Sequence, residues 1–353
     1  MKEAVSNILS SVGSTAPVVP IGATSLSSLP YIYVIDQNGN LLVCCGVANN
    51  QQQGTWFNLG IPEGTPLQTA LGIANDGVQN AYVFSVDETG CVWCNQNTGI
   101  TAAWNYGTWT PLLCPSPPSG PVQLTALGTS FFNDSAYVFC MGDDGNVWYT
   151  STGMTTGDWY TLGPISSSAN IQSCLGVTVN TQENAIQVTV NGSDNNVYQC
   201  NVPPSGPVTW SSADCASTIS KYIGAVWFPS GYFYTAGLDL NGNLQCICWV
   251  GVWSSLNAGQ PLTGPCATPV GVAIDAAGNV SAYVTDNHGV LYSCNLSNNA
   301  TWVSLGTPTT VSTVEGAVGT TVANSIDYIY AIDQSNQIWG CAPSLSQPWT
   351  PMN

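Results

Sequence analysis

The chain repeats one seven-residue ending, and this repetition constrains its fold more than any other feature. The ending is a tryptophan followed by two variable residues and, in several copies, Leu-Gly, as in GTWFNLG, GDWYTLG and ATWVSLG. A period of roughly 20–50 residues indicates a repeat architecture in which every copy forms one structural unit. The seven tryptophans, spaced 43 to 53 residues apart, are Trp56, Trp109, Trp159, Trp210, Trp253, Trp302 and Trp349.

A second shared element precedes each tryptophan: two strand-like runs joined by a short turn, as in YIYVIDQNGNLLVCC and AYVFSVDETGCVWCN. The turns DQNG, DETG and DLNG supply Asp, Asn and Gly where a tight hairpin needs side-chain hydrogen bonds and a positive φ. The first runs are apolar on both faces, which favours sheets packed face to face. A segment of small residues, for example TALGIAND, comes before them. Each unit therefore contains four short strands, the proportion of a β-propeller blade.

The sequence thus predicts an all-β fold, a seven-bladed β-propeller with four antiparallel strands per blade. Residues 17–353 are predicted to form this single domain, and residues 1–16 an N-terminal tail or short helix. Because one continuous segment supplies each blade, we expect blade 1 to pack on blade 7 without an exchanged strand. The predicted blades span about 17–60, 61–113, 114–163, 164–214, 215–257, 258–306 and 307–353.

Charged residues are unusually few, at 6% of the chain, where about a quarter is ordinary. Arginine is absent, Lys2 and Lys221 are the only lysines, and 19 carboxylates give a net charge of −17. Such a charge repels phosphate backbones, so we expect no nucleic-acid partner. The surface must instead consist of Ser, Thr, Asn, Gln and Gly. These groups can hydrogen-bond a neutral polyhydroxylated ligand without the desolvation of fixed charges.

The fourteen cysteines are spread through the chain and do not form the pattern of a disulfide scaffold. Cys44, Cys200, Cys294 and Cys341 share one strand position at which a fifth unit has Ile247, so we expect mainly reduced core thiols. Zinc binding at Cys44–Cys45 or at Cys246 and Cys248 is the sharper alternative, although no histidine accompanies them. No signal peptide or membrane span is evident. We therefore expect a cytoplasmic protein or one exported by a non-classical route, without membrane insertion.

Catalytic chemistry has few candidate residues. His288 is the only histidine, and it lies in the turn DNHG, where a turn role is favoured over acid–base catalysis. The adjacent carboxylates Asp143 and Asp144 lie in an equivalent turn. The turns that begin at Asp36 and Asp239 resemble calcium loops but lack the further ligands that such loops need. The sequence predicts no enzyme, no metal and no cofactor.

The repeat pattern YVF…DDGNVWYT…GDWYTLG resembles the tectonin-type repeat, and especially the seven-bladed propeller lectins of the Photorhabdus and Psathyrella type. The similarity covers residues 18–353. It implies a non-catalytic protein that binds glycans or glycoconjugates at several sites between neighbouring blades. Fucose lectins of the six-bladed Aleuria kind hold the sugar through Arg, so that mode is excluded in a chain without arginine.

Two aromatic columns are candidates for sugar contact. The tryptophan of the repeated ending persists even in the most divergent unit, VTWSSAD, which favours packing over binding. The column on the third strand of each unit is aromatic in five units and has Leu42 and Gln245 in the other two. Its rings can stack on a pyranose while their polar edges meet hydroxyl groups, although a core role is equally open. The candidate carbohydrate-binding residues are Trp93, Trp148, Tyr198, Tyr292 and Trp339, with Trp104 and Tyr106 in the loop AAWNYGTW.

Two classes of function therefore remain. The first is a multivalent lectin that recognises neutral sugars in inter-blade pockets and gains avidity from clustered sites. The second is a structural or protein-interaction propeller whose low charge favours a homo-oligomer. Binding to a glycan array, competed by the free sugar, would distinguish the first from the second.

Overall fold

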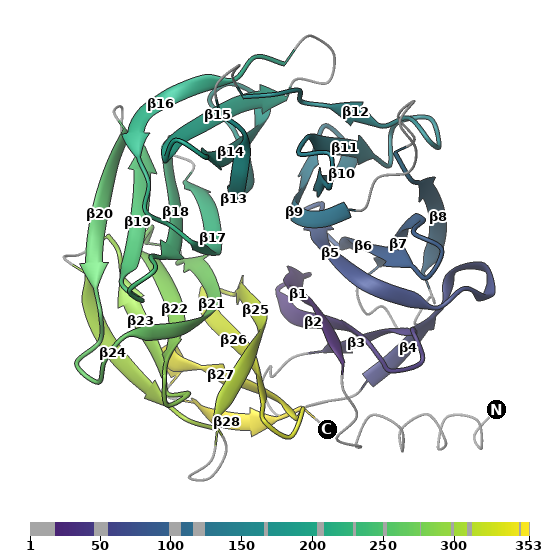
Figure 1. The fold of residues 1–353 in the computed structure, drawn as a ribbon. Helices are drawn as coiled ribbons and strands as arrows, with labels where there is room; N and C mark the ends of the chain where they lie inside the picture. The colour runs from purple at the N-terminus through teal and green to yellow at the C-terminus, as the bar shows by residue number, and fades with distance from the viewer. Residues whose placement is uncertain are drawn as a thin grey trace, which may run out of the picture. The chain divides into compact units, whose positions relative to one another are not determined.

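The structure, a computed structural model, describes residues 18–45, 56–98, 107–115, 124–165, 169–202, 208–228, 231–249, 253–275, 277–297, 300–308, 313–345 and 347–352. The predicted N-terminal tail or helix, residues 1–16, lies outside the described residues. The described strands form seven four-stranded antiparallel sheets, each made of four consecutive strands (Figure 1). The prediction of an all-β, seven-bladed β-propeller is thereby confirmed.

The contacts within the chain define two compact units, which are described separately. The first unit contains blades 1, 2 and 7. Two single-turn 3-10 segments, Pro62–Gly64 and Pro343–Leu345, belong to it. Blade 1 comprises β1 (Val19–Leu26), β2 (Leu29–Ile35), β3 (Leu41–Cys45) and β4 (Trp56–Gly60); blade 2 comprises β5 (Leu67–Asn75), β6 (Asn80–Asp87), β7 (Val92–Thr98) and β8 (Thr108–Leu113); blade 7 comprises β25 (Val314–Ala323), β26 (Ile326–Asp333), β27 (Ile338–Ala342) and β28 (Gln347–Pro351).

The second unit contains blades 3 to 6. Blade 3 comprises β9 (Leu124–Phe132), β10 (Ser135–Gly142), β11 (Val147–Ser151) and β12 (Tyr160–Thr161); blade 4 comprises β13 (Ile171–Asn180), β14 (Ala185–Gly192), β15 (Asn196–Val202) and β16 (Ser211–Ala216). Blade 5 comprises β17 (Lys221–Phe228), β18 (Tyr232–Leu238), β19 (Leu244–Trp249) and β20 (Trp253–Gly259); blade 6 comprises β21 (Cys266–Ile274), β22 (Val280–Asp286), β23 (Leu291–Asn295) and β24 (Thr301–Gly306).

Glycines on the first strands allow neighbouring blades within a unit to approach closely. A Cβ atom on Gly128 would lie 3.0 Å from the Cβ of Val177 in blade 4, and one on Gly224 would lie 3.1 Å from Cγ2 of Val272 in blade 6. A Cβ on Gly319 of blade 7 would lie 3.1 Å from the backbone nitrogen of Ala23 in blade 1. The segments of small residues in the sequence are therefore the places where first strands of successive blades pack against each other.

Three tryptophans of the repeated ending, Trp56, Trp210 and Trp302, connect their blade to the one before it within a unit. The indole of Trp56 is 4% exposed, and its N–H donates to a backbone carbonyl of blade 7. This hydrogen bond and the apolar packing of β2 on β26 join blade 1 to blade 7 without an exchanged strand. The indole Nε1 bonds that cross between blades within a unit are Trp56 to Met352 O (3.3 Å), Trp210 to Leu162 O (3.0 Å) and Trp302 to Ala258 O (3.1 Å).

In blades 1, 4 and 5, the turn between the second and third strands bonds to the chain that leads into or begins the next blade. In blade 1, the carbonyl of Gly39 in this turn accepts the N–H of Leu67, which begins blade 2 (3.0 Å). In blade 5, the carbonyl of Gly242 accepts the N–H of Cys266, which begins blade 6 (2.9 Å). In blade 4, the carbonyl of Asn195 accepts the N–H of Ser217, which lies in the connection to blade 5 (2.9 Å). The Asp-Asn-Gly chemistry of the turns therefore shapes a hairpin and also aligns the next blade.

The cysteine side chains belong mainly to the core. Eleven of the fourteen are buried, and all fourteen thiols are free. Burial raises the pKa of Cys174, Cys266, Cys294 and Cys341 to about 12, which keeps these thiols protonated and unreactive at neutral pH.

We expect a thiol titration of the native protein without reductant to count three groups at most, because only Cys91, Cys114 and Cys248 are partly exposed. The other eleven should react only after denaturation. A denatured protein that reacts only after treatment with a reductant would contradict the reduced core thiols.

Candidate functional site

Polar groups of the aromatic column on the third strands donate hydrogen bonds to the aspartates of the turns. The indole N–H of Trp93 donates to Asp87 Oδ2 at 2.7 Å, and the indole N–H of Trp339 donates to Asp333 Oδ2 at 2.8 Å. The bonded pairs in blades 3, 4 and 5 are Trp148 with Asp144 (3.1 Å), Tyr198 with Asp194 (2.7 Å) and Gln245 with Asp239 (3.0 Å). The polar group at this position therefore binds the turn of its own blade, with or without a ring.

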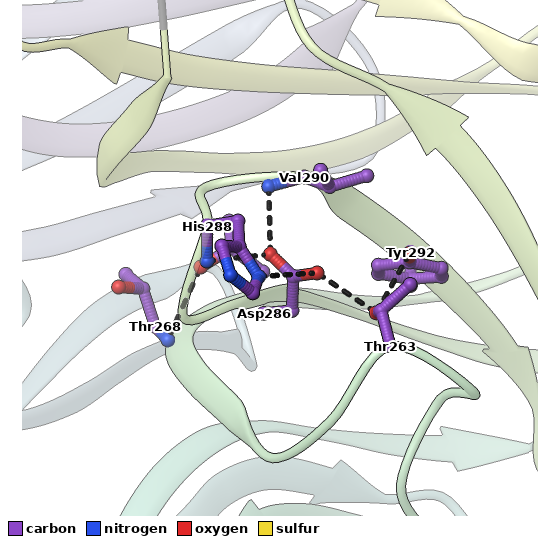
Figure 2. Close-up of polar contacts among 7 residues, drawn as sticks. Thr263, Thr268, Asp286, His288, Val290 and Tyr292 are labelled. Atoms are coloured by element: carbon purple, nitrogen blue, oxygen red, sulfur yellow. Dashed lines mark hydrogen bonds and ion pairs between the residues drawn. The ribbon is translucent and has the colours of Figure 1, made fainter.

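In blade 6, Thr263 lies between the third-strand ring of Tyr292 and the turn aspartate, Asp286. The Thr263 hydroxyl lies 2.8 Å from Asp286 Oδ2 and 2.8 Å from the Tyr292 hydroxyl (Figure 2). Because a carboxylate only accepts, Thr263 donates to Asp286 and Tyr292 donates to Thr263. The His288 imidazole is 69% exposed, with Nδ1 3.7 Å from Asp286 Oδ2. Its backbone N–H donates to Asp286 Oδ1 at 2.8 Å, in agreement with a turn role for this residue.

Hydrogen bonds keep these aspartates ionised. Burial favours the protonated form of Asp87, but the bonds from Thr89, Trp93 and the backbone outweigh burial and lower its pKa. The Tyr198 hydroxyl is the main cause of the lowered pKa of Asp194. The predicted pair Asp143 and Asp144 lies in the turn of blade 3, where Asp144 accepts from Asn146 and Trp148. Among the described residues, no group of three His, Cys, Asp or Glu side chains is placed to hold a metal ion.

The predicted sugar-contact residues differ in exposure. Trp93, Trp148 and Tyr292 are buried, at 6%, 8% and 6% exposed, while Tyr198 and Trp339 are partly exposed. Leu42, in blade 1, is 2% exposed and packs in the apolar cluster between blades 7 and 1. Trp104 and Tyr106 lie outside the described residues. Sugar stacking on the third-strand column stays a prediction, and its burial and its bonds to the turns favour the packing alternative.

One seam between blades, that of blades 4 and 5, is more polar than the four other seams described within the two units. Along β14 of blade 4, Ile186, Val188 and Val190 pack against blade 3, so the alternate residues Gln187, Thr189 and Asn191 face blade 5. All three are at most 2% exposed. We call the contact of these three residues with blade 5 the polar seam. The apolar cluster at this seam has six buried residues, against eleven to fifteen in the clusters between blades 7 and 1, 1 and 2, 3 and 4, and 5 and 6.

The polar seam contains a cavity of about 470 Å³ at the end where the turns lie. We call it the seam cavity. The first two strands of blade 4, the connection between blades 4 and 5, and the turn of blade 5 surround it. Its neutral polar lining includes Gln172, Ser173, Asn191, Asn195, Ser217 and Asn241. Asn191 and Ser217 are buried, whereas Gln172, Asn195 and Asn241 are exposed, so the former lie deeper in the cavity than the latter.

Asn191 is a buried residue of the seam cavity whose side-chain oxygen has no described hydrogen-bond partner. Its side chain is 2% exposed, and neither the described backbone nor a described side chain donates a hydrogen bond to Oδ1. The hydroxyls of Ser173 and Thr189 are likewise buried without a described partner. An unsatisfied buried polar atom costs about 1–3 kcal/mol, and native structures contain few of them. Two of these residues, Ser173 and Asn191, line the seam cavity, and they indicate a place where a ligand completes the hydrogen bonds.

Asp239 is the carboxylate in the wall of the seam cavity, and its oxygens are already occupied. Oδ1 accepts the backbone N–H groups of Asn241 and Asn243 at 2.8 and 2.9 Å, and Oδ2 accepts the side-chain amides of Asn243 and Gln245 at 2.8 and 3.0 Å. Burial favours its protonation, but these bonds prevail and lower its pKa. The groups left for a ligand are therefore neutral amides and hydroxyls.

Comparisons with known proteins bear on the fold. No protein-family model matches the sequence, and no curated protein matches it. Among solved structures, the BP39L lectin from Burkholderia pseudomallei is 16% identical with a TM-score of 0.62 over 96% of this chain and 99% of that one. The fucose-specific lectin from Aleuria aurantia is 13% identical with a TM-score of 0.50 over 82% and 94%.

A third similar structure is a puromycin-hydrolyzing peptidase from Mycobacterium tuberculosis, 11% identical with a TM-score of 0.63 over 97% of this chain and 54% of that one. Lectins and a peptidase thus share this architecture. At these identities the likeness shows the propeller fold, and function has to be argued from the site. In the described part of the chain, no helix is both long and apolar enough to span a bilayer.

Proposed function

We propose that the protein is a non-catalytic carbohydrate-binding protein that holds a neutral sugar in the seam cavity. The observation that carries this proposal is the buried Asn191 amide beside neutral polar groups in a cavity of about 470 Å³. An amide offers both a donor and an acceptor, and hydroxyls such as Ser217 offer the same pair. A sugar hydroxyl also donates and accepts, so it can satisfy both kinds of group at once.

The charge of the protein supports a neutral ligand over an anionic one. The net charge is −17, and Asp239 in the cavity wall is ionised. A phosphate or carboxylate in the seam cavity would meet a like charge and no described cation among the lining residues. Two of the solved structures that share the fold are lectins. The chemistry of the seam cavity supports a ligand of the same class, a sugar, for this chain.

The seam cavity accounts for one site. The finer predictions from the sequence, a tectonin-type repeat, several sites at successive seams and avidity for clustered glycans, stay predictions. The support for a non-catalytic role is that the one carboxylate of the seam cavity is saturated by four hydrogen bonds from Asn241, Asn243 and Gln245. A group held in this way supports structure and is poorly placed to move protons.

We expect replacement of Asn191 by Ala to weaken sugar binding at least tenfold while the melting temperature stays the same or rises. The sugar loses a bonded amide, worth about 1.5 kcal/mol. The free protein loses no hydrogen bond at Oδ1, which has no described donor. Isothermal calorimetry with galactose, glucose, mannose, fucose and N-acetylglucosamine, together with thermal unfolding, measures both effects.

Asn97 of blade 2 provides the matched control. It is 3% exposed and accepts a 2.7 Å hydrogen bond from the buried Tyr33 hydroxyl. Replacing Asn97 by Ala should lower stability and leave sugar affinity unchanged, the reverse of the Asn191 result. A wild-type protein that binds none of the five sugars, or any glycan on an array, but forms concentration-dependent oligomers would favour the interaction propeller instead.

A further inference from the structure

The rim of the seam cavity carries a large apolar side chain, Leu240, at the tip of the turn of blade 5. It is 91% exposed. The corresponding turn position is polar in the six other blades, which have Gln37, Glu88, Asp143, Ser193, Asn287 and Gln334. The turns of blades 1 and 5 have the same hydrogen bonds, with Gly39 N bonded to Asp36 O and Gly242 N to Asp239 O. The turn itself therefore does not require leucine.

A second exposed leucine lies in the loop that leads from blade 5 to blade 6. Leu262 is fully exposed. Its loop is fastened on both sides: Gln260 Nε2 donates to the carbonyl of Asn241 at 3.0 Å, and the Thr263 hydroxyl bonds to Asp286 and Tyr292 (Figure 2). Asn241 is the residue after Leu240. The two leucines are thus held on adjoining loops at the same end of blade 5.

We infer that the ligand of the seam cavity is amphipathic, a neutral glycoside whose apolar aglycone lies over Leu240 and extends towards Leu262. This inference rests on the proposed function. The polar groups Asn191, Ser173 and Ser217 line the cavity, whereas Leu240 lies at its exposed rim. A sugar with an apolar substituent would place its hydroxyls on the former and its substituent on the latter. An unsubstituted sugar would leave Leu240 in water.

The size of the effect follows from the area that the leucines can cover. Each methylene group that moves from water into apolar contact tightens binding by about fourfold. A hexyl aglycone adds five methylenes to a methyl aglycone. If two or three of them are covered by Leu240 and Leu262, the hexyl glycoside binds about 15-fold to 60-fold more tightly than the methyl glycoside.

The test compares methyl and hexyl glycosides of galactose, glucose, mannose, fucose and N-acetylglucosamine by calorimetry. The variant Leu240→Gln introduces the residue that blades 1 and 7 have at this position, so the turn and the fold should be kept. We expect it to bind the methyl glycoside like the wild type and to lose most of the preference for hexyl. Val78→Gln, which removes a side chain 66% exposed in a turn of blade 2, should keep the preference.

The possible outcomes distinguish failure of this inference from failure of the proposed function. Equal affinity of the wild type for methyl and hexyl glycosides, or an undiminished hexyl preference in Leu240→Gln, would overturn the inference and leave a sugar-binding seam cavity. A hexyl preference that Val78→Gln also loses would show non-specific alkyl binding and overturn it too. A wild type that binds none of the ten glycosides would overturn the proposed function and, with it, the inference.

Discussion

Replacement of Gly242 by Ala is expected to lower the free energy of unfolding by about 2–5 kcal/mol, in two separable parts. Gly242 has a φ of +74°, a left-handed conformation that costs an L-residue about 1–2 kcal/mol. A Cβ atom there would also lie 2.6 Å from the carbonyl oxygen of Cys266 and 2.8 Å from Cβ of Pro265, both in blade 6. Relieving this overlap requires the two blades to separate, which adds about 1–3 kcal/mol.

Gly145 of blade 3 is the matched control because it occupies the same place in its turn. Its φ is +78°, its N–H bonds to the carbonyl of Gly142, and no described heavy atom lies within 4 Å of a Cβ placed on it. Gly145→Ala should therefore show only the conformational cost of about 1–2 kcal/mol. Urea denaturation of both variants gives the difference. Equal losses of stability would mean that the turn of blade 5 does not hold blade 6.

Replacement of Trp148 by Ala is expected to lower the free energy of unfolding by about 3–5 kcal/mol while sugar stoichiometry stays unchanged. The indole is 8% exposed and its N–H donates to both carboxylate oxygens of Asp144, at 3.1 and 3.2 Å. The variant loses a buried ring and leaves Asp144 with fewer donors. Urea denaturation and calorimetric titration with a bound sugar measure the two quantities.

Trp148→Phe refines this experiment because it keeps a ring and removes only the N–H. We expect it to lose about 1.5–3 kcal/mol, the contribution of a hydrogen bond to a charged group. A stable Trp148→Ala protein with one sugar site fewer would instead show that this indole stacks on a sugar, as the third-strand column was predicted to do.

The sequence was sufficient to predict the fold because the same structural requirements recur in several of the repeats. Trp56 and Trp302 each bond to the preceding blade, so the repeated ending marks a contact and not merely a strand. The turn aspartates of blades 1 and 5, Asp36 and Asp239, both accept the N–H groups two and four residues later. Local chemistry of this kind is visible in a single chain, and its repetition identifies the architecture.

The seam cavity was harder to predict because its residues come from two blades. Asn191 and Ser173 belong to blade 4, and Asn241 to blade 5, and nothing in their local sequence indicates that they meet. A signal did exist: in IQVTVN, residues 186–191, apolar and polar residues alternate strictly, whereas the corresponding run of blade 1 is apolar on both faces. Alternation in a strand that should be buried on both sides indicates a polar seam.

The turn contacts have a consequence for how such a chain can grow. In blades 1 and 5 a turn carbonyl, that of Gly39 or Gly242, receives the first backbone N–H of the next blade, and in blade 4 the carbonyl of Asn195 receives an N–H of the connection that leads to the next blade. The donor is a backbone group, so any non-proline residue can supply it. A copied segment of one blade brings its own donor at the start and its own acceptor in the turn. Duplication of a blade therefore preserves the junction on both sides, while the side chains at each new seam are free to diverge, as those between blades 4 and 5 have done.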